Sequence, residues 1–278
     1  ARLMFIEGAR WPDDNKWTIH DRPTWHTARW AIVAADAPPE AKAAAEARKG
    51  RSTGQAIEAL VLNHAVLSST ESNSTERAVA LSWLLHLVGD IHQPLHVSDQ
   101  FSAKFPAGNG AGTQEYVADP LRDSAIPLHM LWDSNAFRST KMEDVDRNAQ
   151  ALMEEFPRSE YPELTALEVP VDFEGWARES HQVAVDFAYG YGIDTVKDPD
   201  AGLDPDKAVR KMVMFVLEGI SPVEDAPEVP AEYWEKLQHI AKRRITLAGY
   251  RIADCIIAAA DQIATEQSYT GKALETLD

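Results

Sequence analysis

The sequence contains a single cysteine, Cys255, among its 278 residues. One cysteine excludes an intramolecular disulfide and any zinc site built on cysteine thiolates. Long apolar runs are also missing, since no stretch approaches the roughly 18 residues that a membrane helix needs. Residues 1–14 lack the apolar core and the small residues of a secretory signal. The sequence therefore predicts a soluble protein.

Basic residues are scarce: 27 lysines and arginines stand against 44 aspartates and glutamates, which gives a net charge of −17. This charge opposes broad electrostatic adhesion to nucleic acid or to anionic membranes. Bound cations can reverse the sign of the field locally, so any phosphate chemistry here must be centred on metal ions. The length and the 45% of hydrophobic residues are those of a globular protein, most simply one domain spanning residues 1–278.

The most informative stretch is 81–96, LSWLLHLVGDIHQPLH. Its apolar residues recur at steps of three and four, which predicts a helix with one broad apolar face. Asn73 with Glu76 predicts where this helix begins, and Pro94 predicts where it ends.

Two side chains within this predicted helix are costly to bury. His86 and Asp90 are four residues apart and project from the same side. A buried imidazole and a buried carboxylate need partners, which either a metal ion or hydrogen bonds within the core would supply. His96, just after Pro94, adds a third possible ligand.

Helical periodicity returns along the rest of the chain, and strands are few. Pro12 and Pro23 interrupt the tryptophan-rich start, so we expect turns and loops over Arg2–Trp30. Residues 35–52 are small and polar, which predicts a mobile surface segment. Further helices are expected over residues 54–67, 141–156, 173–191 and 230–263, and a brief strand or hairpin over residues 113–118. The fold class that follows is all-α, a mainly helical domain with a small β-hairpin.

Residues of metal-ligating types recur at a matched spacing. His129 and Asp133 repeat the four-residue step of His86 and Asp90, and two such pairs on separate helices can face one another in a helical core. Nitrogen and hard oxygen ligands suit zinc without any thiolate. Seven ligands suit two ions, which act together on a phosphate ester when they lie about 3.5–4 Å apart. The candidate ligands are Asp13, His26, His86, Asp90, His96, His129 and Asp133.

Four motifs carry a resemblance to a known family. They are WPD at 11–13, WH at 25–26, HLVGDIHQPLH at 86–96 and LHMLWD at 128–133. In order and spacing they resemble the zinc-dependent, single-strand-specific nucleases of fungi, plants and bacteria, which share their fold with bacterial zinc phospholipase C. The resemblance implies an endonuclease that cleaves single-stranded DNA and RNA to 5′-phosphorylated products, with 3′-nucleotidase activity. It also implies a secreted or periplasmic protein, and it points to no particular protein partner.

The resemblance also implies residue roles, matched by motif position. One zinc falls on Asp13, His26, His86 and Asp90, a second falls on His96, His129 and Asp133, and Asp90 bridges toward a third. Catalytic roles fall on Asp13, Lys16 and Asp90: a metal-bound hydroxide attacks phosphorus, while Lys16 supports the phosphate in the transition state. Arg29 stands where relatives carry an aspartate that reads the base, and an arginine there favours phosphate contact.

One element of the resembling family is not found in this sequence. The family completes its third zinc with an N-terminal tryptophan, whereas this sequence begins at Ala1. We expect that the family's N-terminal segment is absent from this sequence, and that two or three zinc ions bind.

Two other functions remain open on the same residues: a phospholipase C-like phosphodiesterase and an inactive zinc-binding scaffold. Asp133 favours the nuclease, because the phospholipases carry glutamate there. His92 is expected either behind the ligands or on the surface, and His20, His64, His181 and His239 are expected to be structural. Phe101, Phe105 and Tyr116, near the glycine-rich loop, are candidates to stack a base.

Overall fold

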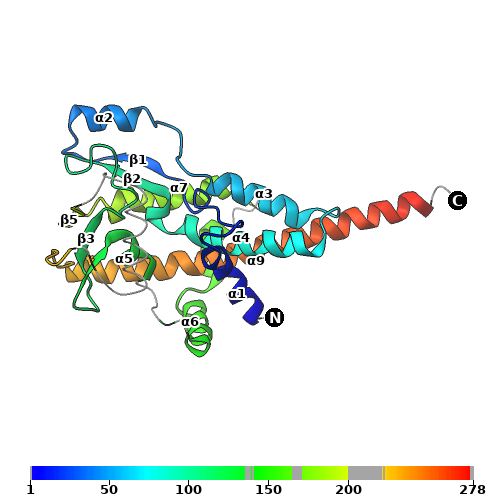
Figure 1. Ribbon diagram of the computed structural model, residues 1–278. Helices are drawn as coiled ribbons and strands as arrows, with labels where there is room; N and C mark the ends of the chain where they lie inside the picture. Colours follow the sequence, from blue (N-terminus) through cyan, green and yellow to red (C-terminus); the bar gives the residue numbers. More distant parts are fainter. Residues whose placement is uncertain are drawn as a thin grey trace.

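The computed structural model describes residues 2–134, 139, 141–164, 171–199, 221 and 223–275. All seven candidate ligands, Lys16 and Arg29 lie within these ranges. Figure 1 shows helices packed along a long C-terminal helix, whose last turns extend past the body of the protein. Within the described residues, no helix combines the length and the apolar character that crossing a membrane requires.

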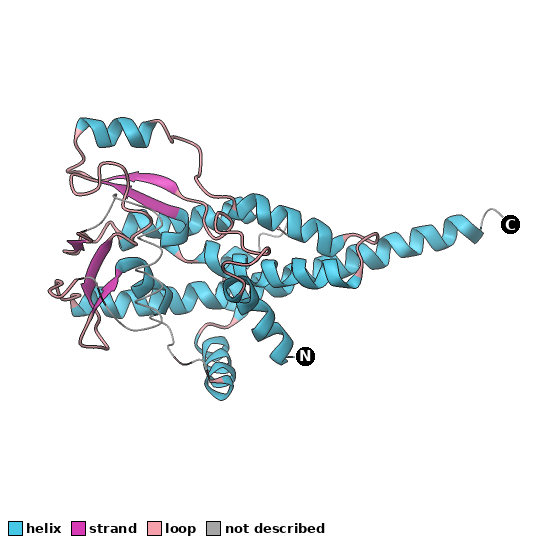
Figure 2. Ribbon diagram, in the orientation of Figure 1, coloured by secondary structure: helices cyan, strands magenta, loops and turns pink. Residues whose placement is uncertain are grey.

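Helices dominate the described chain, which confirms the all-α fold class (Figure 2). The α-helices are α1 (Arg2–Asp14), α2 (Pro39–Glu46), α3 (Ala56–Ser68), α4 (Ser74–His92), α5 (Leu128–Ser134), α6 (Met142–Glu155), α7 (Phe173–Val183) and α9 (Ala231–Glu275). Shorter helical segments are η1 (Pro94–Val97), η2 (Arg158–Glu160), η3 (Pro162–Leu164) and the π-helical η4 (Ala184–Ala188). The strands are β1 (Trp30–Val33), β2 (Ser98–Phe101), β3 (Glu115–Ala118), β4 (Ala125–Pro127) and β5 (Val196–Lys197).

Helix α4 is the predicted organising helix, and its limits confirm the sequence signals. Asn73 Oδ1 accepts a hydrogen bond from the Glu76 backbone N–H at 3.0 Å, and Glu76 Oε2 accepts one from the Asn73 backbone N–H at 2.9 Å. This reciprocal capping box satisfies two of the donors that a helix start leaves unpaired. Pro94 follows the last turn and begins η1, which carries His96. The apolar face of α4 is buried against α3, α7 and α9.

Helix α1 was not expected, so the prediction of turns and loops over Arg2–Trp30 is wrong for its first half. Pro12 lies inside the helix and removes one backbone donor. Close packing on α4 offsets this cost: a Cβ atom at Gly8 would lie 3.4 Å from Ser82 Oγ. Chain turns without helix do follow, from Asn15 to Arg29.

The segment 35–52, expected as a mobile surface segment, contains α2. This helix buries Ala41 and Ala45 in a small cluster with Phe101, so the segment is anchored rather than free on the surface. Its alanines are small enough to let the helix pack closely against β1 and β2. Most of the segment is exposed, as expected, and its small side chains also allow one face of α2 to be buried.

A parallel strand pair also lies outside the sequence prediction. Strand β1 pairs with β2 so that Trp30 faces Ser98. The two strands follow His26 and His96 in the sequence. The pairing continues back toward these histidines, because the Ala28 backbone N–H donates to the His96 carbonyl oxygen at 3.1 Å. The pair therefore holds two candidate ligands, far apart in sequence, side by side.

The brief strand or hairpin predicted over residues 113–118 is confirmed by β3, which forms an antiparallel hairpin with β4 and also pairs with β5. Strand β4 leads directly into α5, which carries His129 and Asp133. The expected helices over 54–67 and 141–156 are confirmed as α3 and α6. The helix expected over 173–191 is α7 followed by π-helical η4, and the C-terminal helix runs on to Glu275.

Candidate metal centre

The seven candidate ligands come together from α1, the chain after it, α4, η1 and α5. Two groups form, and within each the possible ligand atoms all lie within 4.8 Å of one another. The first group is Asp13, His26 and His86, and the second is His96, His129 and Asp133. The sequence places these residues up to 120 positions apart, yet the fold gathers them as two compact sets of nitrogen and oxygen atoms.

Asp90 lies between the two groups. Its Oδ2 atom is 3.1 Å from His26 Nδ1 and 3.3 Å from His86 Nε2, both in the first group. Its Oδ1 atom is 3.8 Å from His96 Nδ1, in the second group. One carboxylate thus faces ligands of both sets.

Three of the four histidines are anchored in the same way. The Nδ1–H of His86 donates to the Ala9 carbonyl oxygen at 2.9 Å, and that of His129 donates to the Ala111 carbonyl oxygen at 2.8 Å. The Nδ1–H of His96 donates to the carbonyl oxygen of another candidate ligand, His26, at 2.7 Å. A backbone acceptor on Nδ1 fixes the tautomer of a neutral imidazole and leaves the Nε2 lone pair free.

The free nitrogens point at carboxylates of the candidate site. His96 Nε2 is 3.4 Å from Asp133 Oδ1, and His129 Nε2 is 3.5 Å from Asp133 Oδ2. His86 Nε2 is 3.9 Å from Asp13 Oδ1. Lone pairs that converge with carboxylate oxygens, each backed by an outer hydrogen bond, are the arrangement expected of metal-ligating histidines.

His26 is oriented differently. Its Nδ1 faces Asp90 and lies 3.0 Å from His86 Nε2, so two imidazole nitrogens point at each other beside a carboxylate. Its Nε2 is buried and has no hydrogen-bond partner among the described residues. The donor set of this group fits a cation, because a cation satisfies facing nitrogen and oxygen lone pairs together.

Charge coupling across the site is strong. Burial disfavours the Asp90 carboxylate, but the neighbouring His86 and His96 outweigh it and hold the pKa of Asp90 well below its usual range. Burial likewise opposes protonation of the two histidines, yet Asp90 and its neighbours raise the pKa of His86 to about 9 and that of His96 to about 10. Partial burial raises the pKa of Asp133, but His129 and His96 lower it further, to about 2.

Lys16 and Arg29 occupy different surroundings. Lys16 lies at the exposed edge of the first group, where its Nζ is 3.0 Å from Asp13 Oδ1. Arg29 is half-buried, its backbone pairs with Thr53, and its Nε has no hydrogen-bond partner within the described chain. Contact of Arg29 with a substrate stays a prediction.

The aromatic residues expected to stack a base are buried instead. Phe101, Phe105 and Tyr116 are 1%, 3% and 2% exposed, so this prediction is wrong. The glycine-rich loop folds back onto β2, where Gly108, with φ of 99°, packs against the Asp99 carboxylate. Phe101 packs under α2 against Ala41 and Ala45, and Tyr116 packs against Ala125 of β4.

Gln93 contributes to the site and was not singled out by the sequence. Its Nε2 donates to Asp133 Oδ1 at 2.7 Å, and its Oε1 accepts from the Leu95 backbone N–H. It thereby links the end of α4 to the ligand-type carboxylate of α5. Its place within HQPLH was visible, but an amide has no ligand spacing that would mark it.

A buried ion network lies behind α4. The Glu179 carboxylate receives two hydrogen bonds from Arg251, at 2.7 and 2.8 Å, and one from Arg244 at 3.1 Å. The side chains of Arg251 and Arg244 are only 3% and 7% exposed. Two buried cations therefore share one carboxylate, so part of their charge must be offset elsewhere.

The C-terminal end of α4 provides that offset. Arg244 Nε donates to the His92 carbonyl oxygen at 3.3 Å, and Ser180 Oγ donates to the Ile91 carbonyl oxygen at 2.6 Å. The last carbonyls of a helix carry partial negative charge and lack partners within the helix. The network thus fixes the end of α4 just beyond Asp90.

His92 belongs to this network, so of its two expected positions, behind the ligands or on the surface, the surface one is wrong. It is buried, its Nδ1–H donates to the Val88 carbonyl oxygen at 2.7 Å, and its Nε2 accepts from Arg251 Nη1 at 2.9 Å. Burial, and then the charges of Arg244 and Arg251, hold the pKa of His92 well below its usual value. A neutral His92 acts as an acceptor behind the ligands.

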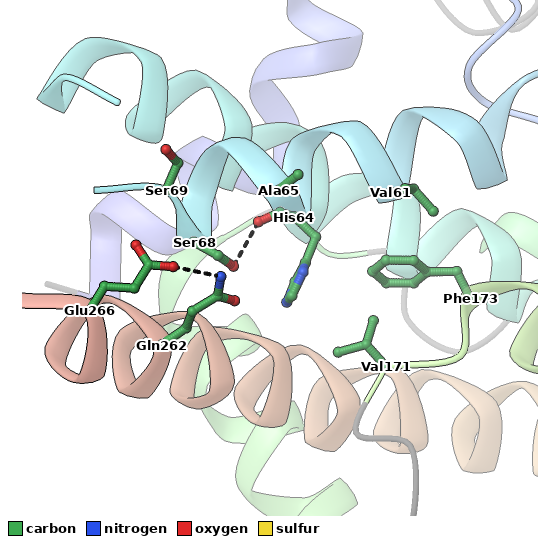
Figure 3. A pocket seen from close by; sticks show the side chains of 9 residues that line it. All are labelled: Val61, His64, Ala65, Ser68, Ser69, Val171, Phe173, Gln262 and Glu266. Carbon is green, nitrogen blue, oxygen red and sulfur yellow. Dashed lines mark hydrogen bonds between the residues drawn. The ribbon is translucent and has the colours of Figure 1, made fainter. Parts of the chain in front are cut away.

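A cavity of about 470 Å³ lies between α3, α9 and the chain that leads into α7 (Figure 3). Figure 3 shows the His64 ring pointing into it, between Phe173 and Gln262. Burial lowers the pKa of His64, and its Nε2 has no hydrogen-bond partner within the described chain. None of the seven candidate ligands lines this cavity, so it is separate from the candidate metal centre.

A helical body that gathers six histidine and aspartate side chains in two compact sets, with Asp90 between them, has the organisation of a metal-dependent enzyme. Comparison with known proteins defines the class further. A model of the S1/P1 nuclease family matches residues 2–261, and the chain belongs to this family. The chain is also similar to Nuclease S1 of Aspergillus oryzae, with 26% identity over 263 residues that cover 91% of this chain and 78% of that protein.

Family membership confirms the resemblance derived from the four motifs. The chain is therefore a member of a family of metal-dependent nucleases, hydrolases that act on the phosphodiester bonds of nucleic acids.

Proposed function

We propose that the protein is a zinc-dependent phosphodiesterase that cleaves single-stranded DNA and RNA to 5′-phosphorylated products and removes phosphate from 3′-nucleotides. The observation that supports this most is the set of three histidines with Nδ1 fixed by backbone carbonyls and Nε2 directed at aspartates. Histidine and aspartate ligands without thiolate suit zinc. Residues 1–278 act as one nuclease domain, secreted or periplasmic as the family resemblance implies.

Two zinc sites follow from the two groups. Asp13, His26, His86 and Asp90 would hold one ion, and His96, His129 and Asp133 would hold a second. Asp90 faces both groups and would couple the two ions. It would also bridge toward a third ion, as the family resemblance implies. Two ions carry a charge of about +4 against three aspartates, so the pocket is locally positive despite the net charge of −17. Bound zinc would supply Lewis acidity toward a phosphate ester and toward water.

The protein's own residues bind and orient the substrate. The Lys16 ammonium, on the exposed side of Asp13, places a positive charge where a phosphate oxygen approaches and stabilises charge that develops in the transition state. The low pKa values of Asp90 and Asp133 keep both carboxylates ionised at neutral pH. The hydrogen bond from Gln93 holds the Asp133 carboxylate in one orientation.

Removal of metal should abolish activity. Dialysis against EDTA is expected to stop hydrolysis of a single-stranded oligonucleotide and phosphate release from a 3′-nucleotide, and added zinc should restore both. Metal analysis should find two or three zinc ions per chain, and mass spectrometry should find 5′-phosphates on the products. Activity that survives complete zinc removal, or turnover of phosphatidylcholine in place of oligonucleotides, would contradict the proposal.

Zinc binding should release protons. Because the pKa values of His86 and His96 are raised to about 9 and about 10, both imidazoles are charged at pH 7 in the absence of metal. Zinc needs their lone pairs, so binding displaces about two protons and the apparent affinity rises by up to about 100-fold between pH 7 and pH 8. Titration calorimetry in buffers of different ionisation enthalpy measures the number released. His96→Gln should lower that number by about one, and an enthalpy independent of buffer would count against the charged histidines.

A further inference from the structure

The turn that follows α1 exposes an aromatic side chain directly after Lys16, which lies at the edge of the candidate metal centre. We define the 15–22 turn as residues 15–22, NKWTIHDR. Trp17 in this turn is 74% exposed, which makes it the most exposed aromatic residue of the described chain, and Ile19 is 85% exposed. Two large apolar side chains exposed within three residues of chain exceed the single exposed residues that folded proteins commonly carry.

The backbone conformation at Trp17 is unusual for a bulky residue. Trp17 has φ of 70°, in the left-handed region that bulky residues rarely adopt. The Asp21 carboxylate holds this conformation by accepting a hydrogen bond from the Trp17 backbone N–H at 2.8 Å. Such a strained residue persists only where its surroundings determine it, and strained residues cluster at functional sites.

The rest of the turn is tightly hydrogen-bonded. Thr18 Oγ1 donates to the Asn15 carbonyl oxygen at 2.7 Å, and the Asp21 backbone N–H donates to the Thr18 carbonyl oxygen at 3.1 Å. Arg22 Nη1 donates to the carbonyl oxygens of Ile19 and Asp21 at 2.9 and 2.7 Å. A turn fixed in this way presents the indole without a large loss of conformational freedom on binding.

The position of the turn connects it to the chemistry. Trp17 directly follows Lys16, whose Nζ is 3.0 Å from Asp13 Oδ1, and that atom is 3.9 Å from His86 Nε2. The Cα atom of Trp17 therefore lies about 3.8 Å from that of Lys16, the residue predicted to contact the phosphate. Lys16 and Arg22 against Asp21 give the turn a net charge of +1 in a protein whose net charge is −17.

We infer that Trp17, with Ile19 beside it, is a stacking platform for a nucleobase next to the phosphate held at the metal centre. The inference rests on the proposed function and adds a substrate contact to it. Aromatic side chains bind single strands by stacking on the faces of unpaired bases. The bases of a duplex are already paired and stacked, so a platform of this kind favours single strands over duplexes.

The test compares strands with and without bases. Trp17→Ala should lower kcat/KM about 5- to 100-fold on a single-stranded oligonucleotide, mainly through KM. The variant should act like the wild type on the same strand carrying abasic sites, since no base is left to stack. Trp17→Phe, which keeps a ring, should recover most of the loss. Ile257→Ala removes a similarly exposed apolar side chain, 58% exposed, from α9 and should change neither rate.

Further measurements separate this inference from the proposed function. Zinc content and melting temperature should be unchanged in Trp17→Ala. Binding of a fluorescent single strand to the EDTA-treated protein should weaken in this variant, whether or not the wild type is active. Equal loss on base-containing and abasic strands, or no loss of binding or rate, overturns the inference alone. If Trp17→Ala changes only the oligomeric state, the turn contacts a second chain, and this result also overturns the inference. A wild type that hydrolyses no phosphate ester overturns the proposed function, and strand binding then decides the inference.

Discussion

Asp90→Asn is expected to lower kcat/KM on single-stranded oligonucleotides by about 10³-fold or more and to reduce the bound zinc below that of the wild type. Asp90 is the one candidate ligand whose two carboxylate oxygens face both groups, at 3.1 Å from His26 and 3.8 Å from His96. Asparagine keeps the shape but removes the negative charge that would offset two cations. A loss of several kcal/mol of metal stabilisation corresponds to about three powers of ten in rate.

Matched substitutions make this prediction specific. Asp133→Asn removes a carboxylate from the second group only, so it should cost less activity and about one zinc. Asp14→Asn changes a neighbour of Asp13 that pairs with Arg10 at the surface, at 2.8 Å, and should leave the rate within about twofold. Metal analysis and steady-state kinetics on the three variants test whether Asp90 serves both groups. An Asp90→Asn enzyme with the full zinc content and a rate within tenfold of the wild type would show that Asp90 is not a metal ligand.

Local sequence signals predicted the parts of the fold that depend on local physics. The limits of α4 follow from a capping pair, an apolar period and a proline, each readable within a few residues. The ligand candidates were readable for the same reason, because His86 and Asp90 lie one helical turn apart on one face. The structure then brings all seven candidates together, which no local signal could show.

Tertiary packing determined what the sequence did not predict. The proline in α1 argued for a loop, but packing against α4 through Gly8 outweighs the lost backbone hydrogen bond. Strand pairing of β1 with β2 joins short segments almost 70 residues apart, and β2 has no alternating apolar pattern. The rings of Phe101 and Phe105 looked available beside a glycine-rich loop, yet both are buried, and Phe101 packs against the alanines of α2.

The ion network behind α4 could likewise not be predicted from the sequence. Glu179 and Arg251 lie 72 residues apart, and charges on two amphipathic helices are usually read as solvated faces. Their burial appears only when α7 and α9 pack on the same side of α4. This arrangement predicts a large loss of stability when the shared carboxylate is removed.

Glu179→Gln should lower the free energy of unfolding at pH 7 by about 2–4 kcal/mol. The substitution leaves the buried Arg244 and Arg251 without a counter-charge, and breaking such a pair from one side costs about 3–5 kcal/mol when both partners are buried. Glu179 is 35% exposed, so solvent screening reduces the expected loss. Urea unfolding measures it. Glu174→Gln is the matched control on α7, because its pair with Arg178 is exposed on both sides and should be worth less than about 1 kcal/mol.

The pH dependence distinguishes this ion network from simple packing. Burial raises the pKa of Glu179, but hydrogen bonds and charge from Arg251 and Arg244 lower it further, to below its usual value. A folded-state pKa below the unfolded one adds stability that is fully present above the unfolded pKa, about 4.5, and is lost as pH falls through the folded-state pKa. The difference between wild type and Glu179→Gln should therefore stay constant from pH 7 to pH 5.5 and shrink below about pH 4.5. A difference that does not change with pH would mean that the carboxylate charge is not what stabilises the end of α4.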